Sequence, residues 1–335
     1  MNIVGTINPW GCDDFIGTIR NVIDLGIKTY RVNLKTYYKK EHFDYLLEVM
    51  REMLLIDDEL SFIFDIGFPR DTSRTVINNN KGYIKVKGND IYLSNGFSFF
   101  SDETVFINKE VKIRSGDIIF YGDGQYYFTV TELCSDGRWR AETNIPDITI
   151  WGNTALHFNK EIQENPYNMD LISVFFEEIR SKIDYKVALS FVESKSDLES
   201  FSKLCGDLDV ICKIESQKAI DNLDEILEVC DHIMLGRGDL FFNTKIEDFL
   251  KNQMTVIKKC IEKNKTIIVS TGILTSMKDD ILPARADLID ILMLNELGVQ
   301  CINLSSHLIQ SANIKKIVEL VDGLFDAKRL YVNYQ

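Results

Sequence analysis

The chain has 335 residues, of which 45% are hydrophobic and 11% aromatic, so it is long enough for about two domains and is not intrinsically disordered. The formal net charge is −13 at pH 7, and this acidic balance argues against nucleic acid and anionic membrane surfaces as partners. An acidic protein can still bind an anionic metabolite in a locally positive pocket.

Two features of the sequence bear on where the protein works. No stretch reaches 18 consecutive apolar residues, so we expect no transmembrane helix, and the first residues lack the basic run and apolar core of a secretory signal. The seven cysteines are scattered and include no Cys-x-x-Cys pair, so neither a zinc ribbon nor a redox dithiol is expected. We therefore expect a cytoplasmic protein with buried, reduced thiols.

The first part of the chain alternates between short strands and helices. We expect strands at 3–7, 29–34 and 61–66 and helices at 13–25 and 41–55. Gly26 follows the first helix, at the position where helix ends favour glycine. Such alternation predicts a parallel sheet built from crossover units.

Between residues 76 and 150 the pattern changes. We find no amphipathic helix there, only short alternating runs such as YIKVKG and TVFINKEVKI, separated by turn signals such as Gly122-Asp123-Gly124. Short strands with frequent turn signals are typical of a small all-β barrel or sandwich. Since this segment interrupts an α/β pattern, we interpret it as an insertion.

The α/β alternation resumes after Pro146. The expected strands are 186–193, 209–215, 232–236, 266–271 and 300–305, and the expected helices are 169–184, 195–205, 219–230, 245–263, 283–298 and 311–328. Three strands before the insertion and five after it make eight, which predicts an α/β fold, a (β/α)8 TIM barrel. We assign residues 1–75 and 151–335 to the barrel and 76–150 to an inserted β-barrel domain after the third strand.

Polar residues gather at the C-terminal ends of the predicted strands, where the active site of a (β/α)8 barrel lies. Arg31, Asn33 and Lys35 share one face, because side chains alternate along a strand. The rim as a whole carries three cations and three carboxylates: Arg31, Lys35, Lys213, Asp65, Glu215 and Asp239. Two carboxylates with open water positions suit Mg²⁺ or Mn²⁺, so the sequence predicts an anionic substrate bound through a divalent metal.

The stretch from Lys213 to Leu240, with KIESQ and DEILEVCDHIMLGRGDL, resembles the central segment of the pyruvate kinase family. Shorter segments are similar to that family as well: IVGTINP at 3–9, YRVNL at 30–34, IFDIGFPRDTSRT at 63–75, IIVSTGILTSM at 267–277 and PARA at 283–286. The resemblance covers nearly the whole chain, and it implies the barrel fold expected from the strand count. It also implies that the inserted β domain is the family's mobile lid.

At the matching positions, the resemblance implies a role for each residue. Glu215 and Asp239 would ligate the divalent metal, and Lys213 would neutralise charge on the transferring phosphoryl group or the enolate. Backbone amides at Gly238 and Asp239 would hold the substrate carboxylate, because glycine lets N–H groups approach an anion. Thr271 would lie near the carbon that gains or loses a proton.

The resemblance also implies a phosphate-binding side of the site. Arg31 would contact the phosphoryl oxygens as a catalytic residue, and Arg74 would be a second phosphate contact. Asn33 and Lys35 would complete the substrate-binding set.

The sequence departs from the family at its monovalent-cation site. The family uses Asn, Ser, Asp and Thr, and these positions here are Asn33, Lys35, Asp65 and Ile66. A K⁺ ion would be repelled by the Lys35 ammonium a few ångströms away. We therefore expect Lys35 to supply the positive charge and K⁺ not to be required.

Other departures concern the nucleotide and the chain's end. The family's lysine that helps to bind nucleotide phosphate is Ala141 here, and Phe241 replaces a glycine. Whether a nucleotide binds is therefore left open. The chain stops after the last predicted barrel helix, so we expect no counterpart of the family's C-terminal regulatory domain. The sequence also leaves a homo-oligomer open.

Three functional hypotheses follow from these residues. The first is a pyruvate-kinase-like phosphotransferase that binds phosphoenolpyruvate, pyruvate or a related 2-oxo acid, with an ordinary or altered acceptor. The second is a metal-dependent 2-oxo acid lyase or aldolase, which the loss of the nucleotide-side lysine favours. The third is a non-catalytic regulator that keeps the fold.

Overall fold

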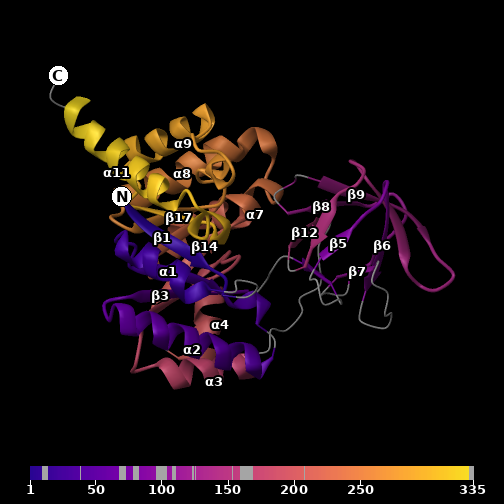
Figure 1. Ribbon diagram of the computed structural model, residues 1–335, viewed down its shortest axis with the longest axis horizontal. Coiled ribbons are helices and arrows are strands. Elements are labelled where there is room, and N and C mark those ends of the chain that lie inside the picture. Colours follow the sequence, from indigo (N-terminus) through magenta and orange to yellow (C-terminus); the bar gives the residue numbers. More distant parts are fainter. Residues whose placement is uncertain are drawn as a thin grey trace. The chain divides into compact units, whose positions relative to one another are not determined.

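The computed structural model describes residues 1–331 except 10–13, 38, 68–72, 78–82, 96–103, 108–110, 123, 125, 153, 159–168 and 207. The chain divides into two compact units. The first contains Met1–Pro69 and Tyr167–Gln335, and the second contains Arg70–Pro166. Figure 1 shows both units coloured along the sequence, and each is described separately below.

In the described part of the first unit, eight parallel strands close into a barrel in the order β1-β17-β16-β15-β14-β13-β3-β2. They are β1 (Asn2–Ile7), β2 (Thr29–Asn33), β3 (Ser61–Ile66), β13 (Asp184–Leu189), β14 (Val210–Ile214), β15 (His232–Gly236), β16 (Thr266–Ser270) and β17 (Cys301–Leu304). All eight were expected from the alternating pattern. The predicted (β/α)8 barrel is therefore confirmed.

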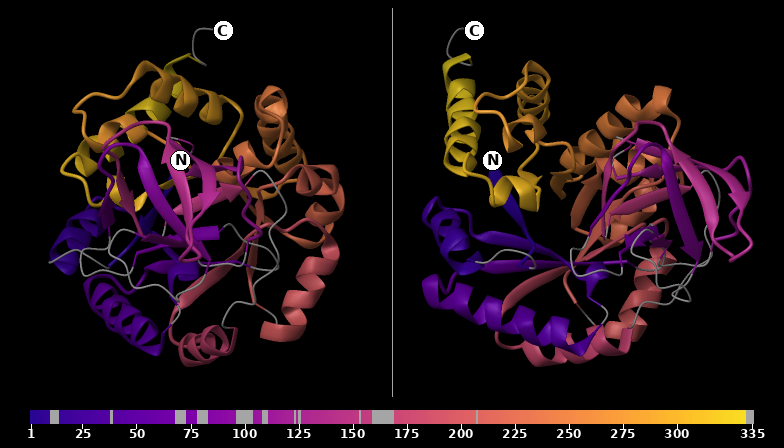
Figure 2. Two further views of the ribbon diagram at one scale, coloured as in Figure 1. Left: turned by 90° about the vertical axis from the view of Figure 1, so that its right-hand side faces the viewer. Right: turned by 45° about the vertical axis from the view of Figure 1, so that its right-hand side comes forward.

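Helices surround this barrel (Figure 2). The longer ones are α1 (Phe15–Asp24), α2 (Lys40–Ile56), α3 (Met169–Ile179), α4 (Lys195–Cys205), α8 (Phe249–Glu262), α9 (Arg285–Glu296) and α11 (Ile314–Tyr331). The shorter ones are η1 (Leu34–Thr36), α5 (Gln217–Asp221), α6 (Leu223–Val229), α7 (Arg237–Phe242), η2 (Ile246–Asp248), η3 (Thr275–Lys278) and α10 (Ser306–Ile309). Among the described residues, no helix has both the length and the apolarity needed to cross a membrane.

One expected helix, 219–230, is in fact two. It breaks at Asn222, which caps the start of α6 and donates its side-chain Nδ2 to the backbone oxygen of Glu193 at 2.8 Å. Asparagine readily satisfies a loop carbonyl in this way, which favours a break over a continuous helix.

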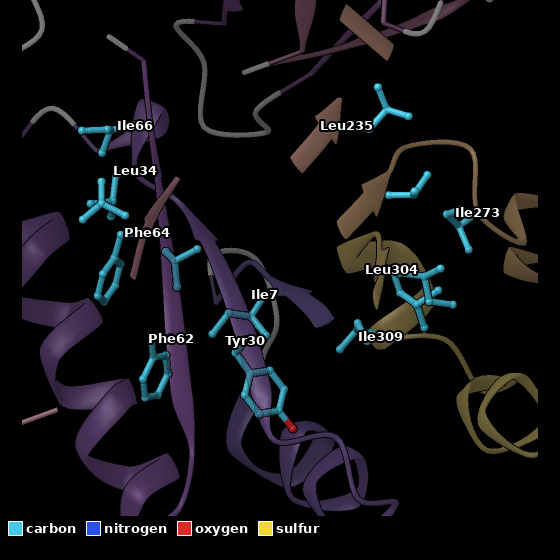
Figure 3. Packing of buried hydrophobic residues seen from close by; sticks show 14 of the residues in the cluster. Ile7, Tyr30, Leu34, Phe62, Phe64, Ile66, Leu235, Ile273, Leu304 and Ile309 are labelled. Carbon is cyan, nitrogen blue, oxygen red and sulfur yellow. The ribbon is translucent and has the colours of Figure 1, made fainter. Parts of the chain in front are cut away.

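Along each barrel strand, side chains point alternately toward the surrounding helices and into the barrel interior. In β2, Tyr30 and Val32 belong to the buried cluster between strands and helices, so Arg31 and Asn33 point to the barrel interior. Figure 3 shows part of the helix-facing cluster, including Phe62 and Phe64. Burial of each large aromatic or aliphatic side chain of this kind contributes about 1.5–3 kcal/mol to the free energy of folding.

The barrel interior changes from apolar to polar along the strand direction. The apolar layer consists of Val4, Ile63, Ala188, Ile211, Met234 and Ile268. Two residues further along the chain from each of these lie Thr6, Asp65, Ser190, Lys213, Gly236 and Ser270. Residues two apart share a face of a strand, so the second set forms a layer on the carboxyl side of the first.

The second unit is built from strands in the part that the structure describes. A closed barrel has the order β10-β6-β7-β4-β12-β8-β9, and β11 (Thr149–Trp151) pairs with β5 (Tyr83–Lys85). The barrel strands are β4 (Ser73–Val76), β6 (Asp90–Asn95), β7 (Thr104–Ile107), β8 (Ile118–Tyr121), β9 (Tyr126–Leu133), β10 (Trp139–Thr143) and β12 (Ala155–Phe158). Inward side chains such as Leu93 and Phe128 of the barrel and Ile150 of β11 form a core of their own.

Candidate active site

Asp65 is the centre of the polar layer. The side chain is fully buried, and its Oδ2 accepts from Arg31 Nε at 2.9 Å and from Arg31 Nη2 at 2.5 Å. Lys213 Nζ lies 3.0 Å from the same oxygen, and Lys35 Nζ lies 3.9 Å from Oδ1. Burial alone would raise the pKa of Asp65, but the charges of Lys213, Arg31 and Lys35 outweigh it and hold this pKa well below its usual range.

Lys213 links Asp65 to the next carboxylate. Its Nζ lies 2.9 Å from Glu215 Oε1 and donates to Ser190 Oγ at 2.9 Å, and Ser190 Oγ donates to Asp65 Oδ1 at 3.2 Å. Burial favours the neutral amine, but the carboxylates of Asp65 and Glu215 raise the pKa of Lys213 above its ordinary value. The raised pKa favours the protonated form, so Lys213 is a buried cation.

Glu215 depends on a glycine in the neighbouring strand. A Cβ at Gly236 would lie 2.7 Å from Glu215 Cγ and closer still to Oε1, so only glycine leaves room for this side chain. Glu215 Oε2 accepts from the backbone N–H of Phe191 at 3.0 Å, and Phe191 itself has a left-handed φ of 51°. Burial raises the pKa of Glu215, Lys213 opposes this, and the negative charge of Asp239 adds to it.

Glu215 and Asp239 fit a divalent cation. Asp239 is partly exposed on the first turn of α7, and its charge acts on both Glu215 and Lys213. The two carboxylates offer oxygen donors of the kind that Mg²⁺ and Mn²⁺ prefer, and a bound divalent cation would relieve the repulsion between their charges. In the described part of the chain no three His, Cys, Asp or Glu side chains are arranged around one metal position. Water or substrate oxygens would therefore complete the coordination.

A hydrogen-bond chain extends from Arg31 across the barrel. Arg31 Nη1 donates to Thr6 Oγ1 at 3.2 Å, and Thr6 Oγ1 donates to Asn303 Oδ1 at 3.0 Å. Asn303 Nδ2 in turn donates to Ser270 Oγ at 2.9 Å. Sequence reasoning missed Thr6, Asn303 and Ser190. All three lie at or just after a strand end, two residues after an inward apolar or partly buried residue. That spacing places them inward but does not distinguish them from other uncharged polar residues at strand ends.

Thr271 has an unusual backbone. It follows β16 with φ of 74°, a left-handed conformation that is uncommon for a β-branched residue and costs about 1–3 kcal/mol. Gly272 comes next with φ of 72°. The carbonyl oxygen of Thr271 accepts from Arg237 Nε at 2.8 Å.

The structure brings together Arg31, Lys35, Lys213 and Glu215 around Asp65. Asn33 pairs in register with Asp65, and its Oδ1 accepts from the backbone N–H of Lys35 at 3.2 Å at the start of η1. Lys35 is thereby held inward, with a side chain that is 2% exposed.

Three other predicted site residues, Gly238, Asp239 and Arg74, lie outside this cluster around Asp65. Gly238 and Asp239 lie in the first turn of helix α7, not in an open glycine turn, because Gly236 caps a helix that starts at Arg237. First-turn N–H groups point out of a helix, as an anion contact requires. Arg74 belongs to β4 of the second unit, and its side chain lies outside the described residues.

Phe241 does not face the carboxylate pair. It packs edge-on against Phe242 and Phe249, with ring centroids 5.4 and 5.3 Å apart. Two helical residues after Asp239, it lies on roughly the opposite side of α7.

The fold and this rim define a class of protein: a (β/α)8 barrel with buried cations and a carboxylate pair at the carboxyl ends of its strands. The family model "Pyruvate kinase, barrel domain" matches residues 1–313, and the chain belongs to the pyruvate kinase family. It is 26% identical over 319 residues to pyruvate kinase 2 of Saccharomyces cerevisiae, covering 91% of this chain and 62% of that protein. It is 30% identical over 236 residues to the pyruvate kinase of Dictyostelium discoideum, covering 65% of this chain and 46% of that protein.

Proposed function

We propose that the protein is a phosphotransferase that binds phosphoenolpyruvate, pyruvate or a related 2-oxo acid together with Mg²⁺ or Mn²⁺. The observation that carries the proposal is Lys213, buried and charged between Asp65 and Glu215 at the rim of a pyruvate kinase family barrel. Positive groups fixed in a site of low dielectric stabilise developing negative charge without further reorganisation.

The chemistry would proceed as follows. The bond between phosphorus and the C2 oxygen of phosphoenolpyruvate breaks, the phosphoryl group passes to an acceptor oxygen, and the remaining enolate gains a proton at C3. Arg31 uses three of its five guanidinium N–H groups for its described partners Asp65 and Thr6, which leaves two for phosphoryl oxygens. When bound by Glu215 and Asp239, the divalent cation supplies charge neutralisation at substrate oxygens.

Lys213 and Thr271 would then act on the enolate. Lys213 offers its charge to the enolate oxygen, which lowers the cost of breaking the bond to phosphorus. Thr271 follows β16, which is separated from Lys213's strand β14 by β15, and it would supply or relay the proton that C3 gains. The amides of Gly238 and Asp239 would hold the substrate carboxylate.

Lys35 supports K⁺-independent activity. Its ammonium is buried 3.9 Å from Asp65, the carboxylate that the family resemblance assigns to the monovalent-cation site. A second cation beside it would be repelled in this low-dielectric position. We therefore propose that Lys35 supplies the charge that K⁺ would otherwise provide.

The acceptor, the role of the second unit and the cellular location are further parts of the proposal. Ala141 stands where the family resemblance places the lysine that helps to bind nucleotide phosphate, and the loss of that lysine favours an acceptor other than ADP as the alternative. The lid role of the second unit, the phosphate contact of Arg74 and a cytoplasmic location rest on the family resemblance and on composition. The chain spans 62% of the yeast relative's length, so the whole-protein activity is part of the proposal.

The decisive test is ³¹P NMR of the purified protein with phosphoenolpyruvate and Mg²⁺, with and without ADP, in buffer free of K⁺. We expect ATP and pyruvate to form only in the tube with ADP. Phosphoenolpyruvate that stays intact in both tubes would contradict phosphotransfer to ADP. Nucleotide-free cleavage or condensation of 2-oxo acids would instead support the lyase hypothesis. Absence of both, with no thermal shift by Mg²⁺ and oxalate, would support a non-catalytic role.

Matched lysine variants assign the activity to the site. Lys213→Met should lower kcat roughly 10²–10³-fold, as expected for loss of a fixed charge-stabilising group. Lys218→Met is the control, because Lys218 is 62% exposed and pairs with Glu193 at 3.3 Å outside the cluster. Equal activity of the two variants would contradict the assignment.

A further inference from the structure

Arg237 connects two adjacent strand ends of the barrel. It is the first residue of α7, directly after β15, and is 9% exposed. Its Nε donates to the carbonyl oxygen of Thr271 at 2.8 Å, while Nη1 and Nη2 donate to the two carboxylate oxygens of Asp290 at 2.7 and 2.8 Å. A guanidinium held at three points has a fixed orientation, so the Thr271 carbonyl has a fixed partner.

The hydrogen bond from Arg237 to the Thr271 carbonyl lies directly after the last paired residues of strands β15 and β16. Strands β15 and β16 pair in register from His232↔Thr266 to Gly236↔Ser270. The next residues on the two strands are Arg237 and Thr271, and they are joined by a side chain instead of the backbone ladder. The barrel is already closed without this bond, so the bond's specific effect is on the backbone after Ser270.

The backbone that Arg237 holds is the strained one. Thr271 is β-branched and has a φ of 74°. Such conformations persist only where surrounding contacts enforce them, and they cluster at functional sites. The hydrogen bond to the Thr271 carbonyl is a contact of this kind, and the bidentate pair with Asp290 fixes the donor.

We propose that Arg237 and Asp290 are positioning residues that hold Thr271 in its left-handed conformation and thereby fix the place of its hydroxyl group. The inference rests on the proposed function, in which the enolate gains a proton at C3 while its C2–O⁻ becomes a carbonyl. In the reverse direction a methyl C–H bond of pyruvate breaks and the proton passes through Thr271 to water. The pair acts on this proton step through Thr271.

The experiment measures the proton step directly. ¹H NMR follows the exchange of pyruvate methyl hydrogens for deuterium in D₂O with Mg²⁺ and ATP. We expect Asp290→Asn to slow this exchange roughly 10–100-fold, because small displacements of a reacting group cost rates of that order. Affinity for Mg²⁺ and oxalate should change by less than about threefold, because the described side-chain hydrogen bonds of Asp290 go to Arg237. Exchange at the wild-type rate would overturn the inference.

A double-mutant cycle separates positioning from a general structural effect. In a Thr271→Ala background, Asp290→Asn should cause no further loss of exchange beyond about threefold. An equal loss in both backgrounds would overturn the inference, because Asp290 would then not act through Thr271. If Asp290→Asn does not fold, Asp290→Glu takes its place in the cycle, since it keeps the charge but displaces the guanidinium.

Two controls complete the design. Glu178→Gln breaks an exposed ion pair with Arg51, where the N–O distance is 3.3 Å, and should leave exchange unchanged. If the wild-type protein shows neither exchange nor phosphoryl transfer, the proposed function itself fails. If the wild type is active but Asp290→Asn exchanges normally, only the positioning role fails.

Discussion

Asp65 pairs with three cationic side chains at once, and the burial of each of these cations depends on the negative charge of Asp65. A buried carboxylate without partners would take up a proton, and buried cations without it would repel one another. Arg31, Lys35 and Lys213 therefore form one electrostatic unit with Asp65, so the loss of the carboxylate should affect folding as well as activity.

The first prediction concerns stability. Asp65→Asn should lower the free energy of unfolding by about 3–5 kcal/mol, because it leaves buried cations uncompensated. The pKa of Asp65 is lowered in the folded state. Its contribution to stability is therefore complete above about pH 4, the unfolded value, and is lost as the pH falls toward the folded pKa.

Urea unfolding between pH 2 and 7 checks this prediction. The wild type should lose stability more steeply than Asp65→Asn as the pH falls below about 4. Asp224→Asn is the matched control, because Asp224 is 60% exposed and pairs with Lys259 and Lys263 at the surface. A similar loss of stability in both variants at pH 7 would contradict the argument.

The second prediction concerns the monovalent cation. Wild-type turnover should be the same with K⁺ and with tetramethylammonium. Lys35→Met should lose roughly tenfold or more of its activity without K⁺ and regain part of it when K⁺ is added, because the ion can then occupy the vacated positive position. Lys39→Met, at an exposed position four residues away, should show neither effect. A wild type that requires K⁺ would disprove the substitution.

At the scale of whole elements, the sequence predicted the barrel strands well because their pattern is local. Each strand is a short apolar run bounded by turns, and Tyr30 and Val32 alternate with Arg31 and Asn33 within five residues. Short helices such as α7 and α10 were missed, because six or four residues are too few to show a helical period.

The candidate site was only partly predictable. Charged strand ends, such as Lys213 and Glu215, stand out among apolar neighbours. The partners Thr6 and Asn303 do not, since uncharged polar residues at strand ends are common. The ion pair between Arg237 and Asp290 joins residues that are 53 positions apart in the sequence, and no local sequence pattern encodes such a contact.

The third prediction tests the packing of β14 against β15. Gly236→Ala would place a methyl group against the Glu215 carboxylate and displace it. Binding of Mn²⁺, measured by electron paramagnetic resonance, should weaken roughly 10–100-fold, as on the loss of ligand orientation. Gly323→Ala in α11, where a Cβ meets nothing, should leave binding unchanged and stabilise the helix by about 0.5–1 kcal/mol. Unchanged binding in Gly236→Ala would contradict the role of Glu215 as a ligand.

At the scale of the whole molecule, the two compact units have separate apolar cores. The proposed ligands contact the barrel rim, so their binding energy should appear in the unfolding of that unit.

The fourth prediction follows from these separate cores. Differential scanning calorimetry should resolve two transitions, and Mg²⁺ with oxalate should shift the one that belongs to the barrel. At 100 times the dissociation constant the added stability is about 2.7 kcal/mol. Pulse proteolysis identifies which unit unfolds in each transition. Equal shifts of both transitions would show that the two units unfold together.

The contrast between the chain's net charge of −13 and its buried cations has a kinetic consequence. At long range an anionic substrate meets a repulsive field, and only at the rim does it reach Arg31 and Lys213. Added salt screens the long-range repulsion more than it weakens contacts in the buried site. The association rate of oxalate, measured by stopped flow, should therefore increase with ionic strength while its dissociation rate changes little. Most enzymes that attract their substrates electrostatically show the opposite trend, so this protein would capture its substrate fastest in concentrated, salt-rich surroundings.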